Sequence, residues 1–246
     1  MKQYKKNYEL KNAAKDKLDG KYGAAVMVCL LSFLIINGAT NLVDYYMPAA
    51  VLSTGPSIPA YIARGVASLF LNWILGVFNL GITLFFLNAA CDRPYNSSNL
   101  FYGFKNDFSK ALSISAVFTL VNAVCLLPFQ YLLEAYLYTR SQTLLTATVV
   151  ALAVGAGIYV PISLGISLSY YLMLDFPDKT AKELLTLSLR IMRGHKRRLF
   201  YLECSFVPLI LLCVCTLFIG FLWLIPYMNM TYAFFFLDIM NPTKTA

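Results

Sequence analysis

Very few side chains in this sequence have the type and spacing that chemistry needs. The only histidine, His195, lies in the basic segment GHKRR (194–198), where a solvated or lipid-facing role outweighs a catalytic one. The chain has no HExxH zinc motif and no Walker phosphate loop. It has no GxSxG nucleophile elbow either, because the segment GISLS (165–169) lacks the final glycine. We therefore expect no catalytic residue, no cofactor, no metal site and no enzyme.

The six cysteines fit this expectation. Five lie inside apolar runs, and Cys91 stands at the end of one. Cys213 and Cys215 are two positions apart and would point to different faces of a helix, which is not a metal-ligand spacing. We interpret the cysteines as small hydrophobic residues rather than as ligands or disulfide partners.

Polar residues inside the apolar runs are the remaining candidates for function. Asn72, Gly76, Asn79 and Thr83 fall on one face of a helix, so this face must meet other helices or a cavity rather than lipid. We favour hydrogen bonds between helices, and a polar pathway is the alternative. Ser163, in a later apolar run, belongs to the same group of candidates.

Glu203 is the ionisable candidate. It lies one turn inside an apolar run, close in sequence to Arg197 and Arg198. An ionisable residue in a span is a functional candidate by default. Because this one lies near the headgroup region, we expect a structural ion pair with those arginines.

These residues must be positioned by membrane-spanning helices. The chain is 59% hydrophobic and only 13% charged, whereas a soluble domain carries about 25% charged residues. Several apolar runs exceed the roughly 20 residues that a spanning helix needs. The sequence therefore predicts an all-α polytopic membrane protein, one membrane domain over 1–246, with six spans at about 22–43, 66–90, 111–136, 144–174, 199–218 and 221–240.

Two amphipathic segments are predicted to lie on the membrane surface as helices, at about 4–20 and 180–193. Glu9-Leu10, Ala14, Leu18 and Gly20 recur as Glu183-Leu184, Ser188, Met192 and Gly194 at identical spacing, and a span follows each copy. The segment 98–110 is a weaker third copy. We therefore predict three parallel units, each a surface helix followed by two spans.

The cations are distributed asymmetrically about the six spans. Of the 20 Lys and Arg residues, 18 fall on the side that holds the N-terminus, the 91–110 and 175–198 segments and the tail. This bias predicts cytoplasmic termini in a bacterial plasma membrane. The net charge of +8 then indicates anionic lipid headgroups rather than nucleic acid as the partner. The predicted headgroup and topology anchors are Lys11, Lys15, Lys21, Arg193, Lys196, Arg197 and Arg198.

Two further segments carry predictions of their own. The outer loop 44–65, which holds three prolines, is longer than most loops and is therefore either functional or mobile. Small residues recur every four positions at Gly157, Pro161, Gly165 and Ser169, which predicts a seam where another helix approaches closely.

Several stretches resemble a known family. They are ELKNAAKDKLDGKY (9–22), LFYGF (100–104), SLRIMRGHKRRLFYLECSF (188–206), GFLWLIPY (220–227) and TYAFFFLDI (231–239). Together they are similar to a family of multi-pass membrane proteins common in Gram-positive bacteria, domain of unknown function 975. The resemblance implies six spans in the plasma membrane and implies no reaction.

Two functional hypotheses follow. The first is a non-catalytic membrane scaffold or accessory subunit, held to anionic lipid and associated with a membrane partner or a second copy. The second is a transporter or export component for an uncharged or amphipathic small molecule or peptide. We favour the first, because no charge lies near the bilayer midplane. A closed core without a cavity at Asn72, Asn79 and Ser163 would exclude the second.

Replacing Lys196, Arg197 and Arg198 together by Glu is expected to scramble topology or weaken insertion, because cations beside a span set its orientation. A topology reporter fused to the C-terminus measures this outcome. Normal topology in the variant would mean that the cluster serves a partner instead.

Overall fold

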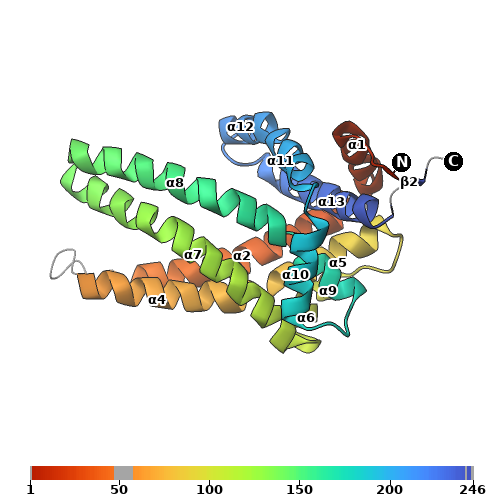
Figure 1. Ribbon diagram of the computed structural model, residues 1–246, viewed down its shortest axis with the longest axis horizontal. Coiled ribbons are helices and arrows are strands. Elements are labelled where there is room, and N and C mark those ends of the chain that lie inside the picture. Colours follow the sequence, from red (N-terminus) through yellow and green to blue (C-terminus); the bar gives the residue numbers. More distant parts are fainter. Residues whose placement is uncertain (1, 47–57, 242, 245–246) are drawn as a thin grey trace.

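The computed structural model describes residues 2–46, 58–241 and 243–244, and these residues are almost entirely helical (Figure 1). The strands within them, β1 (Lys2–Gln3) and β2 (Thr243–Lys244), are two residues long and pair antiparallel. The two ends of the chain therefore lie together. The predicted all-α class is confirmed.

The helices follow the predicted order of surface helices and paired spans. They are α1 (Asn7–Leu18), α2 (Tyr22–Tyr46), α4 (Ile58–Leu75), α5 (Phe78–Ala90), the 3-10 helix η1 (Ser97–Phe101), α6 (Tyr102–Lys105), α7 (Phe108–Thr139), α8 (Gln142–Ile166), α9 (Ser169–Asp175), α10 (Ala181–Ile191), α11 (Lys196–Cys204), α12 (Val207–Cys215) and α13 (Phe221–Met240).

Six helical stretches in the described part of the chain are long and apolar enough to cross a membrane, as predicted. They are Tyr22–Leu42, Ala63–Ala90, Phe108–Thr139, Gln142–Asp175, Lys196–Cys215 and Phe221–Met240. The predicted loop 44–65 lies outside the described residues over 47–57. Around that gap the helices run further than expected, because α2 continues to Tyr46 and α4 begins at Ile58.

Three of the six spans are interrupted, but not at Pro128, Pro161 or Pro226, where prolines favour discontinuous spans and the helices α7, α8 and α13 instead continue. The second span breaks at Gly76 and Val77 between α4 and α5, and the fourth at Ser167 and Leu168 between α8 and α9. The fifth breaks between α11 and α12, where Pro208 stands in the first turn of α12. A proline at this position continues the new helix but cannot donate to the preceding one.

The long helices extend toward one end of the molecule and the surface helices gather at the other (Figure 1). Helices α2, α4, α7 and α8 run to the left of the view, where α7 packs along α8 and α4 packs on both α2 and α7. Helices α1, α6 and α10 lie toward the right, as do both labelled chain ends. One end of the molecule thus consists of long apolar helices, and the amphipathic helices lie at the other end.

The two predicted copies of the surface helix have the same end geometry. A first-turn glutamate accepts the backbone N–H of the residue before each helix, with Lys6 N at 2.7 Å from Glu9 Oε2 and Thr180 N at 2.9 Å from Glu183 Oε2. These bonds satisfy N–H groups that have no partner inside the helix. Each copy ends in a glycine with positive φ, +70° at position 20 and +92° at position 194.

Their apolar faces are also equivalent. Every member of the matched sets is almost completely buried, namely Leu10, Ala14 and Leu18 in α1, and Leu184, Ser188 and Met192 in the segment of α10. The packing follows a cyclic order, because α1 packs on α13, η1 and α6 on α5, and α10 on α8 and α9. Each surface segment thus contacts the second span of the unit before it. This order supports the predicted repeat, which itself stays a prediction.

A buried ion pair joins α11, α13 and the N-terminal segment. Arg198 donates from Nη2 to Asp238 Oδ2 at 2.5 Å and to the Lys5 carbonyl oxygen at 2.6 Å. The carboxylate of Asp238, whose side chain is 3% exposed, also accepts the Lys5 N–H at 3.2 Å. The rings of Tyr4 and Phe235 lie 5.3 and 5.1 Å from the guanidinium, a cation–π arrangement.

Replacing Asp238 by Asn is expected to destabilise the protein by about 3–5 kcal/mol, because it leaves a buried guanidinium without its counter-charge. Thermal unfolding of the detergent-solubilised protein measures the effect. The matched control is Asp92→Asn, because Asp92 pairs with Lys17 and Lys21 on the surface, where such pairs contribute little. Equal shifts of the unfolding temperature in the two variants would mean that the Arg198–Asp238 pair stabilises the protein no more than a surface pair does.

Candidate functional site

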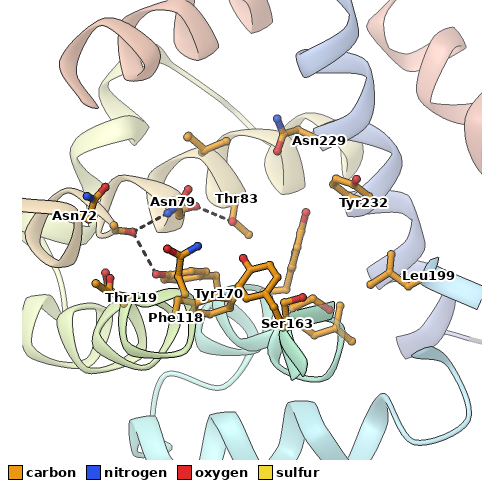
Figure 2. A pocket seen from close by; sticks show the side chains of 18 of the residues that line it. Asn72, Asn79, Thr83, Phe118, Thr119, Ser163, Tyr170, Leu199, Asn229 and Tyr232 are labelled. Atoms are coloured by element: carbon orange, nitrogen blue, oxygen red, sulfur yellow. Dashed lines mark hydrogen bonds between the residues drawn. The ribbon is translucent and has the colours of Figure 1, made fainter. Parts of the chain in front are cut away.

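Five of the six spans surround a cavity of about 900 Å³ (Figure 2). Its wall is formed by α4, α5, α7, α8, α9, α11 and α13. All four intramembrane candidates from the sequence line it: Asn72 and Asn79 from the second span, Ser163 from the fourth and Glu203 from the fifth. Cavities that bind small molecules measure roughly 300–1,000 Å³, so this one has the size of a ligand site.

The break in the second span lies on the cavity wall. In hydrocarbon, a backbone carbonyl that loses its helical partner must find another one inside the protein. The Gly76 carbonyl oxygen accepts the Tyr170 hydroxyl of α9 at 3.2 Å and the Asn79 side-chain N–H at 3.1 Å (Figure 2). The same oxygen accepts the Asn79 backbone N–H at 3.1 Å. Side chains of two spans thus satisfy the interrupted backbone.

Gly76 also allows α4 and α7 to approach each other. A Cβ atom at position 76 would lie 2.0 Å from Ser115 Oγ, a distance that no side chain tolerates. Ser115 meanwhile donates its hydroxyl to the Trp73 carbonyl oxygen at 2.6 Å. The glycine is therefore needed for the contact that places α7 on the cavity wall.

The polar stripe of the second span combines the two arrangements that the sequence allowed. The favoured hydrogen bond between helices is present at Gly76, which accepts the Tyr170 hydroxyl, and Asn79 lies beside the same hydroxyl. It is absent at Asn72, whose side chain donates to Ser68 O on its own helix at 2.8 Å, and Thr83 likewise donates to Asn79 O at 2.7 Å. All four residues also line the cavity, while a polar pathway through the membrane stays a prediction.

The expected ion pair of Glu203 is likewise corrected. Arg198, the expected partner, is bound to Asp238 on α13, and Arg197 is exposed. Glu203 forms no ion pair with any residue that the structure describes and lies on the cavity wall together with Leu199, four residues earlier on the same face of α11. The helix turns Arg198 and Glu203 in different directions, which sequence proximity alone does not show.

The predicted small-residue seam on α8 is correct at Gly165 and wrong at Gly157, whose place is taken by Gly155. A Cβ atom at Gly157 would meet nothing within 4 Å, whereas one at Gly155 would lie 2.2 Å from the Cys125 carbonyl oxygen of α7. Gly165 does belong to a seam, because its Cβ would lie 2.7 Å from a Leu189 side-chain carbon of α10. Ser188 donates to the Gly165 carbonyl oxygen at 2.8 Å in the same contact.

The predicted headgroup anchors fall into three groups: bound inside the protein, ion-paired at the surface, and exposed. Three are bound to the protein: Lys11 Nζ donates to Ser205 O at 2.9 Å, Lys196 Nζ donates to Pro161 O at 2.8 Å, and Arg198 holds Asp238. Partial burial lowers the pKa of Lys11. Lys21 pairs with Asp92 at 3.7 Å. The exposed anchors are Lys15, Arg193 and Arg197, and for these the headgroup role stays a prediction.

Sequence reasoning missed several residues of the wall. Ser115 and Tyr170 hold the break at Gly76, and Asn229 and Tyr232 of α13 line the opposite side (Figure 2). The signal for Asn229 was present, since it is a polar residue in the sixth apolar run. In the described part of the chain, no group of three His, Cys, Asp or Glu residues is placed to hold a metal ion.

These features define a polytopic helical membrane protein with a polar cavity between its spans. The chain belongs to the family described as protein of unknown function (DUF975), whose model matches residues 1–243. The resemblance found in the sequence is thereby confirmed. Neither the curated proteins nor the solved structures contain a match to the chain.

Replacing Gly76 by Ala is expected to destabilise the protein by about 1–3 kcal/mol, the range for overpacking a tight contact. Adding Ser115→Ala should recover part of the loss, because it removes the atom that the new methyl group meets first. Gly157→Ala is the matched control and should be neutral or slightly stabilising. A neutral Gly76→Ala in thermal unfolding would contradict the close contact.

Proposed function

We propose that this protein is a non-catalytic transporter or export component of the plasma membrane, which binds a polar small molecule between its spans. The observation that carries the proposal is the interrupted second span, whose break at Gly76 opens on the polar cavity. Transporters commonly place their substrate sites at discontinuous helices, where irregular backbone lines a cavity. Of the two hypotheses from the sequence, this arrangement favours the second.

Two further observations support the proposal. The break in the fourth span also contributes to the wall, through Ser167 and Leu168. The wall is built from five spans, so a change in their packing changes the shape of the site. A scaffold needs neither interrupted spans nor a cavity of ligand size.

The surface helices support a proposed orientation. Lys15, Arg193 and Arg197 are exposed on or beside α1 and α10, at the end of the molecule where the chain termini meet. Anionic headgroups of the cytoplasmic leaflet would bind these cations, each contributing about 1 kcal/mol near the surface. We therefore place this end in the cytoplasm and make the lipid bilayer the protein's principal partner. Self-association, also predicted from the sequence, is left to measurement.

The test uses purified protein in lipid vesicles loaded with ethanolamine, erythritol or lactate. We expect the protein to accelerate release of at least one of these solutes over protein-free vesicles. Ser163→Trp should abolish that release, because the indole occupies the cavity. Val154→Trp is the matched control, since Val154 lies on the same helix with 58% of its surface exposed toward the surroundings.

Two outcomes would contradict the proposal. One is release of none of the three solutes, which would return the scaffold hypothesis to first place. The other is release that Ser163→Trp and Val154→Trp affect equally, because the solute would then be crossing by a route outside the cavity.

A further inference from the structure

The charge on the cavity wall has one sign. Glu203 contributes a carboxylate, and no Lys, Arg or His side chain lines the cavity in the described part of the chain. Of the cations nearest in sequence, Lys196 donates to the Pro161 carbonyl oxygen, Arg198 pairs with Asp238, and Arg197 is exposed and does not line the cavity. Among the described residues, Glu203 therefore faces the cavity without a counter-charge.

Three asparagine side chains on the wall each donate one of their two N–H groups to a carbonyl oxygen of their own span. Asn72 donates to Ser68 O at 2.8 Å, Asn79 to Gly76 O at 3.1 Å and Asn229 to Ile225 O at 3.0 Å. A carbonyl oxygen only accepts hydrogen bonds, so the amide nitrogen must be the atom that faces it. The side-chain oxygen of each of these asparagines, together with its second N–H, is then left for a ligand.

Four hydroxyl groups on the wall also donate to backbone carbonyl oxygens. Ser163 donates to Val160 O at 3.0 Å, Ser167 to Leu164 O at 2.9 Å, Thr83 to Asn79 O at 2.7 Å and Tyr170 to Gly76 O at 3.2 Å. A hydroxyl has a single proton, so after this bond it offers only its lone pairs. These four hydroxyl groups therefore present their oxygen lone pairs to the cavity.

Some wall residues can act either as hydrogen-bond donors or as acceptors. Asn122 and Gln130 of α7 make no hydrogen bond to the described residues and can offer either amide atom. The aromatic residues Tyr159, Tyr171 and Tyr232 add ring faces, which attract cations. None of these groups carries a positive charge, so Glu203 sets the sign of the charge on the wall.

We propose that the cavity binds an organic cation that carries N–H donors, an ammonium or guanidinium compound, with Glu203 as its counter-charge. This inference rests on the proposed function, because it names the substrate class of the same site. An ammonium group supplies up to three donors to the amide and hydroxyl oxygens of the wall and offsets the charge of the carboxylate. An anion would instead face like charge.

The test measures how charge affects access to the cavity. Ser163→Cys, a nearly isosteric change, is treated in lipid nanodiscs with a cationic methanethiosulfonate (trimethylammonium-ethyl) or an anionic one (sulfonato-ethyl). Mass spectrometry of the peptide that contains position 163 gives the rate at which each reagent modifies the cysteine. Each rate is then divided by the rate at which the same reagent modifies free N-acetylcysteine. We expect the cationic reagent to react about tenfold faster, as one unscreened charge at close range would dictate.

Glu203→Gln in the same background should bring the two rates together. Glu134→Gln is the matched control, because Glu134 lies on α7 away from the wall, pairs with Arg64 and should leave the ratio unchanged. If Glu203→Gln does not yield folded protein, the ratio of cationic to anionic rates in Ser163→Cys alone still decides whether the charge in the cavity is negative.

The unfavourable outcomes separate the two proposals. Equal rates, or a faster anionic reagent, would overturn the cation site while leaving an accessible cavity and the proposed function standing. A ratio that Glu134→Gln lowers as much as Glu203→Gln would remove Glu203 from its assigned role. No reaction with either reagent would mean a closed cavity, which overturns the proposed function as well.

Discussion

The structure depends on one constraint of the bilayer, that no backbone polar group is left without a partner where water is absent. A span can break inside the membrane only where other parts of the protein take over its hydrogen bonds. Here the break at Gly76 is held by Tyr170 from the fourth span, and Ser115 of the third fills the space that the glycine leaves. The contact that makes the interruption tolerable also brings together the helices that form the cavity.

The same constraint governs the charged residues. Several cations near the span ends bind backbone carbonyls or a carboxylate inside the protein rather than water or lipid headgroups. Lys11 and Lys196 bond backbone carbonyls at span interruptions or prolines, and Arg198 neutralises Asp238. With these cations engaged, Glu203 is left to face the cavity. The electrostatic character of the site is thus set by partners that lie outside it.

Much of the architecture could be predicted from the sequence, because span length and surface-helix pattern are local properties. All six spans and both surface helices follow from runs of apolar residues and from capping signals, as the matched ends at Gly20 and Gly194 show. The breaks and the cavity could not be predicted in the same way. They depend on contacts between distant residues, such as Tyr170 with Gly76 or Arg198 with Asp238, and on which of two nearby glycines meets a neighbour.

The cyclic packing of the surface segments has a consequence for biosynthesis. Helix α1 is made before the six spans, yet its main partner α13 is the last of these spans, and the segment before α1 is tied to Arg198 and Asp238. Early in synthesis, α1 can contact only the second span and the segment after it, through α5 and Asp92. Its packing on α13 can form only after all six spans have been made.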